Sequence, residues 1–330
     1  MSLKQSSAKP PRWRVITAFA AVYLIWGSTY LAIRLAVETM PPFLMAGVRF
    51  LIAGAILYVW TRWRGTPQPT RAHWLAAAGV GGLLLLGGNG GVVWAAQHVP
   101  SGLTALLIAT VPLWMALLNW LRPNGVKPGN GAIVGLLLGF VGIMLLIGPN
   151  KFASGQRVDS LGATVLIIAA LSWAVGSLYS RQAKLPASPL LATGMEMLAG
   201  GALLLIAGLL FGEWTRFELS APSLRSWLAL SYLILCGALI GFTAYIWLLR
   251  VTTPAQASTY AYVNPVVAIF LGWAFAGEPL TGRTLLAAAI IVAAVVVITT
   301  QRAPSVKEKK REQGERRILT RPRAVSELVD

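Results

Sequence analysis

The sequence contains little charge, one cysteine and two histidines. Only 12% of its 330 residues are charged, about half of the proportion that is typical of soluble domains. The single cysteine, Cys236, excludes an intramolecular disulfide and a cysteine-based metal site. Neither His73 nor His98 has a second histidine or a serine motif beside it, so neither indicates a catalytic centre. We therefore expect no bound metal, no cofactor and no enzymatic activity.

A phosphate-binding loop is also missing. The glycine-rich run at 81–91 is not followed by the Lys-Ser or Lys-Thr pair that a nucleotide-binding loop requires. Close packing of helices through small residues explains this run better. Asn89 lies inside the run, with two glycines on either side. Two interpretations of Asn89 stay open: a packing contact, or a locally loosened helix that lines a cavity.

Hydrophobic residues make up 56% of the chain, and its mean hydropathy is +0.67. A helix that crosses a bilayer needs about 20 consecutive, mostly apolar residues. Such segments are found at 15–36, 42–60, 74–94, 101–121, 129–148, 161–180, 188–210, 226–249, 255–276 and 283–300. The sequence therefore predicts an all-α polytopic protein with ten transmembrane helices in a lipid bilayer.

The positive charges are distributed unevenly between the predicted loops. The net charge is +17, and most lysines and arginines lie in the N-terminal segment 1–14, in alternate loops and in the tail 301–330. This is the positive-inside pattern of membrane proteins. It predicts cytoplasmic termini and does not indicate a nucleic-acid partner. The basic tail is poor in apolar residues, so we expect it to be disordered.

The chain also repeats itself. When the sequence is compared with itself at an offset of 147 residues, and of 153 after a short gap, many of its rarer residues coincide. The matched pairs include Trp26 with Trp173, Arg34 with Arg181, Pro42 with Pro189, Gly47 with Gly194, Gly54 with Gly201, Trp94 with Trp247 and Pro112 with Pro265. The predicted repeats extend over 15–148 and 161–300, and each contains five spans.

An odd number of spans in each repeat places the second copy upside down in the membrane. Two halves related by an axis in the membrane plane are typical of secondary transporters, in which they exchange conformations around a site near the midplane. The repeat therefore predicts a transporter for a small-molecule substrate.

Four stretches of the sequence resemble the EamA branch of the drug/metabolite transporter superfamily. They are IWGSTYLAIR at 25–34, PPFLMAGVRF at 41–50, VPSG at 99–102 and ASTYAYVNPVVAIFLGWAFAGEPL at 257–280. The resemblance extends over nearly all of residues 15–300. It implies a ten-helix exporter of metabolites, amino-acid-like compounds or drugs in the bacterial inner membrane.

The resemblance also implies that the first, third, fourth, sixth, eighth and ninth helices surround a central cavity. The candidates for a substrate pocket are aromatic and amide residues of these helices. They are Trp26, Tyr30, Asn89, Trp94, Trp114, Trp173, Tyr179, Tyr245, Tyr260, Tyr262 and Asn264. An interfacial aromatic belt is the alternative for several of the aromatic residues. Pro112 and Pro265 are predicted helix breaks, because proline removes a backbone donor.

Four charged residues lie in or near the spans. Arg49 and Glu196 occupy equivalent places, where a charge needs a partner, a backbone cap or a water-filled cavity. For Arg49 we favour a structural contact with helix-end carbonyls over a functional role. For Glu196, proton coupling and a structural hydrogen bond both stay open. Arg34 and Arg181 are predicted near opposite surfaces, as interface anchors or gate contacts.

Together these patterns favour a secondary active transporter that exports small metabolites, such as amino acids or drug-like compounds. A passive facilitator of the same fold is the main alternative. A membrane-embedded enzyme would need clustered acid, histidine or metal-ligating residues, which the sequence lacks. The residues predict no particular oligomeric state.

Overall fold

The computed structural model describes residues 10–300 except 96, 100–103, 105–106, 123–127, 148–159, 219–220 and 277–280. Within these residues every regular element is helical and no strand occurs. The predicted all-α fold is therefore confirmed. The predicted disordered tail, 301–330, lies outside the described residues.

Each predicted span contains at least one helix. In chain order the elements are α1 (Arg12–Val37), α2 (Pro42–Trp63), α3 (Arg71–Gly81), η1 (Gly82–Gly90), α4 (Gly91–Ala95), α6 (Val111–Leu121), α7 (Asn130–Ile147), α9 (Ser160–Ser180), α10 (Pro189–Leu210), η2 (Trp214–Arg216), α11 (Leu224–Tyr232), η3 (Leu233–Phe242), α12 (Thr243–Val251), α13 (Pro254–Ala257), α14 (Tyr260–Ala276) and α15 (Gly282–Thr300). In the described part of the chain, 6 continuous helices are long and apolar enough to cross a membrane, and shorter apolar helices accompany them.

Local sequence explains several helix ends. Pro42 and Pro189 are the first residues of α2 and α10, where a missing backbone N–H has no intrahelical partner to lose. The Thr70 hydroxyl accepts a hydrogen bond from the backbone N–H of His73 and caps the start of α3. Gly65, in the turn between α2 and α3, adopts a φ of 81°, which glycine reaches without strain.

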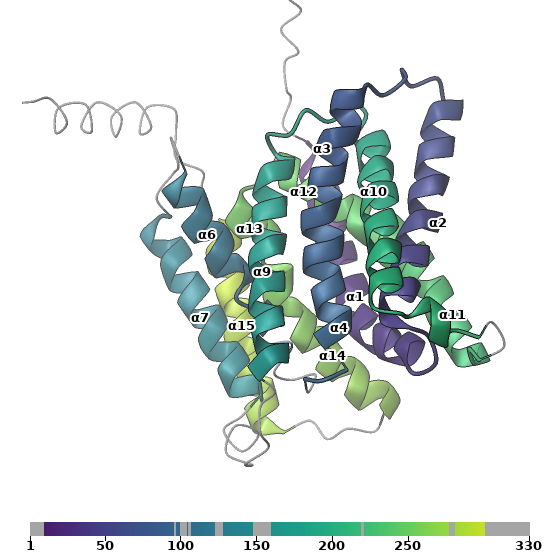
Figure 1. Cartoon of the computed structure of the whole chain (residues 1–330). Coiled ribbons are helices and arrows are strands. Elements are labelled where there is room, and N and C mark those ends of the chain that lie inside the picture. The colour runs from purple at the N-terminus through teal and green to yellow at the C-terminus, as the bar shows by residue number, and fades with distance from the viewer. Residues whose placement is uncertain are drawn as a thin grey trace, which may run out of the picture.

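Equivalent helices of the two halves pack against each other. α2 lies along α10, and α7 lies along α15. In the same way, α1 packs on α14 as its equivalent α9 packs on α6. Figure 1 shows α6, α7 and α15 gathered on one side of the bundle, with α10 and α2 toward the other. This pairing is what two inverted five-helix repeats produce around a pseudo-two-fold axis.

The contact between α2 and α10 depends on four glycines. Gly47 faces Gly201, and Gly54 faces Gly194. Because Gly47 is equivalent to Gly194 and Gly54 to Gly201, exchanging the two halves turns one contact into the other. A Cβ atom on Gly54 would lie 2.8 Å from the backbone nitrogen of Leu198 and 2.9 Å from the carbonyl oxygen of Gly194. The helices therefore cross this closely only because these positions lack side chains.

A second glycine contact holds α10 on its other side. A Cβ atom on Gly200 would lie 2.8 Å from the carbonyl oxygen of Gly81 in α3. The backbone of α10 is thus packed tightly between α2 and α3, and a small residue is required at each close approach.

The third and eighth spans are not regular α-helices. α3 continues into the π-helix η1, and α11 continues into the π-helix η3, at similar places in the two repeats. A π-helix bonds residue i to residue i+5, which widens the helix, and such segments are frequent at functional sites. Asn89 lies in η1. The helix is therefore locally widened at Asn89, as in one of the two interpretations that the sequence left open.

We expect Gly54→Ala to destabilise the protein, because the added methyl group would overlap the backbone of α10. Overpacking of this kind costs about 1–3 kcal/mol of unfolding free energy. Thermal unfolding of the purified protein in detergent measures it. Gly129→Ala is the matched control, since a Cβ atom there meets nothing within 4 Å. Equal melting temperatures for the two variants would contradict the close crossing.

Candidate functional site

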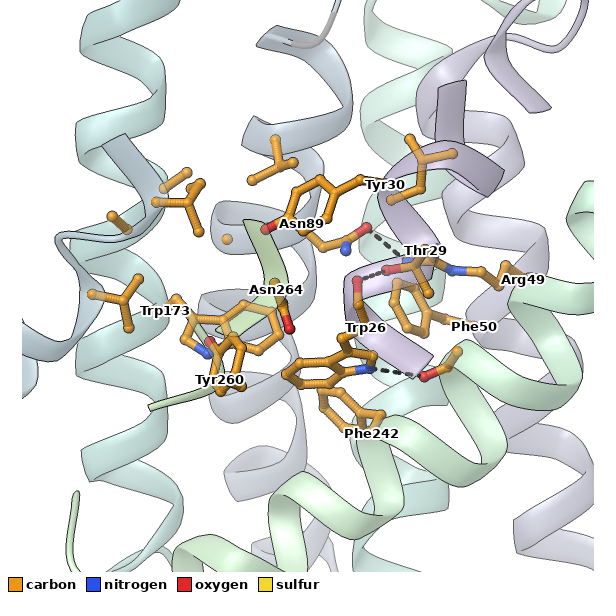
Figure 2. Close-up of a pocket in the computed structure, with 18 residues that line it drawn as sticks. Trp26, Thr29, Tyr30, Arg49, Phe50, Asn89, Trp173, Phe242, Tyr260 and Asn264 are labelled. Carbon is orange, nitrogen blue, oxygen red and sulfur yellow. Dashed lines mark hydrogen bonds between the residues drawn. The ribbon is translucent and has the colours of Figure 1, made fainter. Parts of the chain in front are cut away.

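A cavity of about 90 Å³ lies between the two halves of the chain. Its walls come from α1, α2, η1, α4 and α6 of the first half and from α9, η3 and α14 of the second (Figure 2). Three pairs of equivalent residues line it: Trp26 and Trp173, Asn89 and Phe242, and Val111 and Asn264. The cavity therefore lies on the pseudo-axis. Since drug-sized ligands occupy pockets of about 300–1,000 Å³, this conformation accommodates only a small ligand.

Aromatic rings form one wall of the cavity. The Trp26 ring meets the Trp173 ring edge-on, with centroids 5.7 Å apart, and meets the Tyr260 ring edge-on at 4.9 Å. The Phe242 and Trp173 rings also meet edge-on, with centroids 6.4 Å apart. Edge-to-face pairs at these distances are the favoured arrangement of aromatic rings. The wall is therefore well packed and presents apolar surface to the cavity.

Hydrogen bonds hold this wall from both sides of the axis. The Trp26 indole nitrogen donates to the carbonyl oxygen of Gly237, in η3, at 3.1 Å. On the other side, the Ser172 hydroxyl of α9 donates to the carbonyl oxygen of Leu83, in η1, at 2.8 Å. Each π-helix thus offers a carbonyl to a side chain from the first helix of the opposite repeat.

The opposite edge of the cavity is polar. A terminal guanidinium nitrogen of Arg49 donates to the Asn89 side-chain oxygen at 2.9 Å. The same guanidinium lies over the Phe50 ring, 4.2 Å from its centroid. Arg49 is only 4% exposed, and its Nε has no hydrogen-bond partner among the described residues. The sequence favours helix-end carbonyls as its partners. The partner in the structure is an amide, because Arg49 lies well inside α2, where helix carbonyls are already bonded.

Asn264 supplies a second amide to the cavity. It lies beside the Tyr30 hydroxyl and is 2% exposed (Figure 2). Its side-chain oxygen has no partner among the residues that the structure describes. An unpaired buried acceptor is costly, so this oxygen is available for a donor on a ligand.

Five of the predicted pocket residues do not line the cavity. Trp94 stacks on His98, with ring centroids 4.6 Å apart. Tyr179 is 41% exposed, and its ring lies against Gly79. The Trp114 indole nitrogen is buried but faces no hydrogen-bond partner in the described part of the chain. The helix to which a residue belongs does not by itself predict the direction of its side chain.

Tyr245 and Tyr262 are the other two predicted pocket residues that do not line the cavity. The Tyr245 hydroxyl accepts a hydrogen bond from Trp173 Nε1 at 3.0 Å, so Tyr245 supports the aromatic wall from behind. The Tyr262 hydroxyl donates to the carbonyl oxygen of Leu136, in α7, at 3.3 Å. Residues two apart on a helix point in nearly opposite directions. Tyr260 therefore faces the cavity while Tyr262 packs between α14 and α7.

Phe50, Phe242 and Thr29 line the cavity but were not among the candidates. The repeat contains a signal for Phe242, because this residue is equivalent to Asn89 at the offset of 153. Thr29 lies one turn after Trp26 in α1. Phe50 lies next to Arg49, and no sequence pattern distinguishes it from the other apolar residues of α2.

Glu196 lies in α10 and does not line the cavity. It is 0% exposed, and neither carboxyl oxygen has a hydrogen-bond partner among the described residues. The structural hydrogen bond that the sequence left open is therefore not present in the described part of the structure. Its own backbone carbonyl lies against Gly81 of α3.

Arg181 and Arg34 differ although they are equivalent. Arg181 follows the end of α9 and donates from one guanidinium nitrogen to the carbonyl oxygens of Leu249 and Thr252, the latter at 2.9 Å. This contact, which we call the Arg181 contact, ties the end of α9 to the end of α12. Arg34 is exposed, and no side-chain hydrogen bond of Arg34 occurs with the described residues.

The two predicted helix breaks also differ. Pro112 is at the start of α6, directly after a turn, so the fourth span is interrupted there. Pro265 lies inside the continuous helix α14, next to Asn264. Among the described residues, no group of three or more histidines, cysteines, aspartates or glutamates is placed to hold a metal ion.

Comparison with known proteins identifies relatives along both halves. The EamA-like transporter family matches residues 13–148 and 160–300. The inner membrane transporter YedA of Escherichia coli strain K12 is 44% identical over 266 residues, which is 80% of this chain and 83% of the relative. The transporter YvbV of Bacillus subtilis is 24% identical over 279 residues, which is 82% of this chain and 87% of the relative.

A crystal structure of another protein has the same fold. It superposes with a TM-score of 0.69 at 24% sequence identity, over 87% of this chain and 97% of that one. The predicted resemblance to the EamA branch is confirmed by the family match. Because the family match extends over both halves, the chain belongs to the EamA-like transporter family and is a membrane transporter.

Proposed function

We propose that the protein is a secondary active transporter that exports small metabolites across the bacterial inner membrane by alternating access. The observation that carries this proposal is the cavity on the pseudo-axis, which residues of both halves line. A site between two inverted halves is open to each side in turn when the halves exchange conformations. The small size of the cavity favours metabolites such as amino acids over drug-sized compounds.

The positive-inside charge pattern supports an orientation with both termini in the cytoplasm. The name of the Escherichia coli relative supports the inner membrane as the location. In this orientation the end of α9 and the Arg181 contact lie on the cytoplasmic side, and Arg34 lies on the opposite side.

Two differences between equivalent residues support the proposal that this structure is one of two alternating states. The cavity reaches Arg49 of the first half but does not reach its equivalent, Glu196. Arg181 bonds the end of a neighbouring helix, whereas its equivalent, Arg34, is exposed. In the exchanged state, Arg34 would bond the equivalent end of the third span, near Val99. The two arginines would then close opposite sides of the cavity in turn.

Glu196 is our proposed proton-coupling residue. An ionised carboxylate costs at least about 2.5 kcal/mol within a membrane. The described residues give this carboxyl group no hydrogen bond, and its electrostatic partner is Arg250. A carboxyl group that must lose and regain a proton as its surroundings change can couple a proton gradient to the exchange of conformations. A passive facilitator would not need it.

The aromatic wall is tested by ligand binding. A thermal-shift screen against amino acids and other small metabolites detects ligands, since a compound that binds only the folded state raises the melting temperature. We expect compounds that stabilise the parent protein to lose this effect in Trp173→Ala and to keep it in Trp214→Ala, which changes an exposed tryptophan. Stabilisation that persists unchanged in Trp173→Ala would contradict a substrate site at this wall.

The Arg181 contact is tested by cysteine labelling. In a Cys236→Ser background, Ser180→Cys places a thiol at a buried position beside the contact. We expect Arg181→Ala to raise the rate of maleimide labelling several-fold, because α9 and α12 are no longer tied together. Arg34→Ala is the matched control and leaves the rate unchanged. The same rate in all three proteins would show that Arg181 is an anchor and not a gate.

Proton coupling is tested with Glu196→Gln in proteoliposomes. The amide has nearly the same shape but does not release a proton, so we expect the variant to exchange substrate across the membrane without responding to an imposed pH gradient. Size-exclusion chromatography and thermal unfolding verify that it folds. Accumulation driven by a pH gradient in this variant would exclude Glu196 as the coupling residue. If the parent protein itself never accumulates substrate against its gradient, the protein is a passive facilitator.

A further inference from the structure

We propose that the cavity selects organic carboxylates with an apolar or aromatic body, and that Arg49 binds the carboxylate group. This inference rests on the proposed function, since it concerns the same site, and it names the class of substrate. It follows from the one charged side chain among the described residues that line the cavity.

Arg49 has unused capacity to donate hydrogen bonds. A guanidinium group carries five N–H donors, and the hydrogen bond to the Asn89 side-chain oxygen, at 2.9 Å, uses a terminal nitrogen. Nε is buried and has no partner in the described part of the structure. Nε and a terminal nitrogen together form the donor pair that binds a carboxylate through both of its oxygens.

Arg49 also has no protein anion as a partner in the described part of the structure. Among the described residues that line the cavity, none is an aspartate or glutamate. Glu196, the acid at the equivalent place in the second half, is in α10 and outside the cavity lining. Glu213 accepts hydrogen bonds from the backbone N–H groups of Phe43 and Leu44 instead. A buried cation without a counter-ion is costly in a membrane, and an anionic ligand would offset this cost.

The surroundings fix Arg49 in place for this role. Asn89 holds one end of the guanidinium group, and the face of the Phe50 ring covers it at 4.2 Å. Figure 2 shows Arg49 reaching from α2 toward Asn89, at the edge of the cavity away from Trp173 and Tyr260. A side chain held in this way loses little conformational freedom when it binds a ligand.

The rest of the cavity suits the apolar part of such a ligand. The rings of Trp26, Trp173, Tyr260 and Phe242 offer aromatic surface, and Asn264 adds a neutral amide. The site therefore combines a single positive charge with an apolar wall. A cationic amine of the same shape would meet a like charge, and the described lining residues include no acid to pair with it.

A series of ligands with one body and different charges tests the inference. 3-Phenylpropionate, 3-phenylpropanamide and 3-phenylpropylamine share a phenylpropyl body and carry negative, zero and positive charge. Quenching of tryptophan fluorescence measures binding to the purified protein. We expect 3-phenylpropionate to bind at least about tenfold more tightly than the other two, since hydrogen bonds to charged groups are the stronger ones. Equal or tighter binding of the amide or amine, or no binding of 3-phenylpropionate, would overturn the inference without the use of any variant.

Variants then separate this inference from the proposed function. Arg49→Met removes the charge at similar size, and we expect it to lose the preference for 3-phenylpropionate over the amide, whereas Arg34→Met keeps it. If Arg49→Met binds 3-phenylpropionate as the parent does while Trp173→Ala does not, the site is correct and the carboxylate inference fails. If Trp173→Ala also binds all three compounds as the parent does, the proposed site itself fails.

Discussion

The close crossing of α2 and α10 joins the two halves of the bundle. Four glycines, two from each half, bring the two backbones together in a pair of contacts that the pseudo-axis exchanges. The crossing sets the distance between the halves. Arg49 lies two residues after Gly47, so it points to a different face of α2 from the glycines. That face borders the cavity, and the crossing therefore sets the place of its only charged lining residue among those described.

The two halves have the same fold but carry different side chains at equivalent positions of the cavity region. At equivalent positions the first half has Asn89 and Arg49, and the second half has Phe242 and Glu196. As a result, the cavity has a polar, positive edge and an aromatic wall. In the proposed transport cycle, a symmetric framework would allow two states of similar energy, and the asymmetric lining would give a ligand a defined orientation in each of them.

The sequence predicted the architecture well and the cavity only in part. Spans, repeat and inverted pairing follow from hydrophobic length and from coincident tryptophans, prolines and glycines, which are long-range patterns. The direction of each side chain depends on helix rotation, and η1 and η3 alter that rotation within their spans. Trp26, Asn89, Trp173 and Tyr260 line the cavity as expected, whereas Tyr262, two residues from Tyr260, does not. The Asn89 partner of Arg49 lies 40 positions away in the chain, beyond the reach of any local pattern.

We propose that the two halves exchange conformations around the shared cavity. Spin labels near Arg181 and Thr252 report one side of the bundle, and labels near Arg34 and Val99 report the other. Distances across both gaps can be measured by pulsed electron–electron double resonance, with and without a ligand that stabilises the protein. We expect the first gap to widen as the second narrows. Gaps that widen together, or that stay constant in every condition, would contradict it.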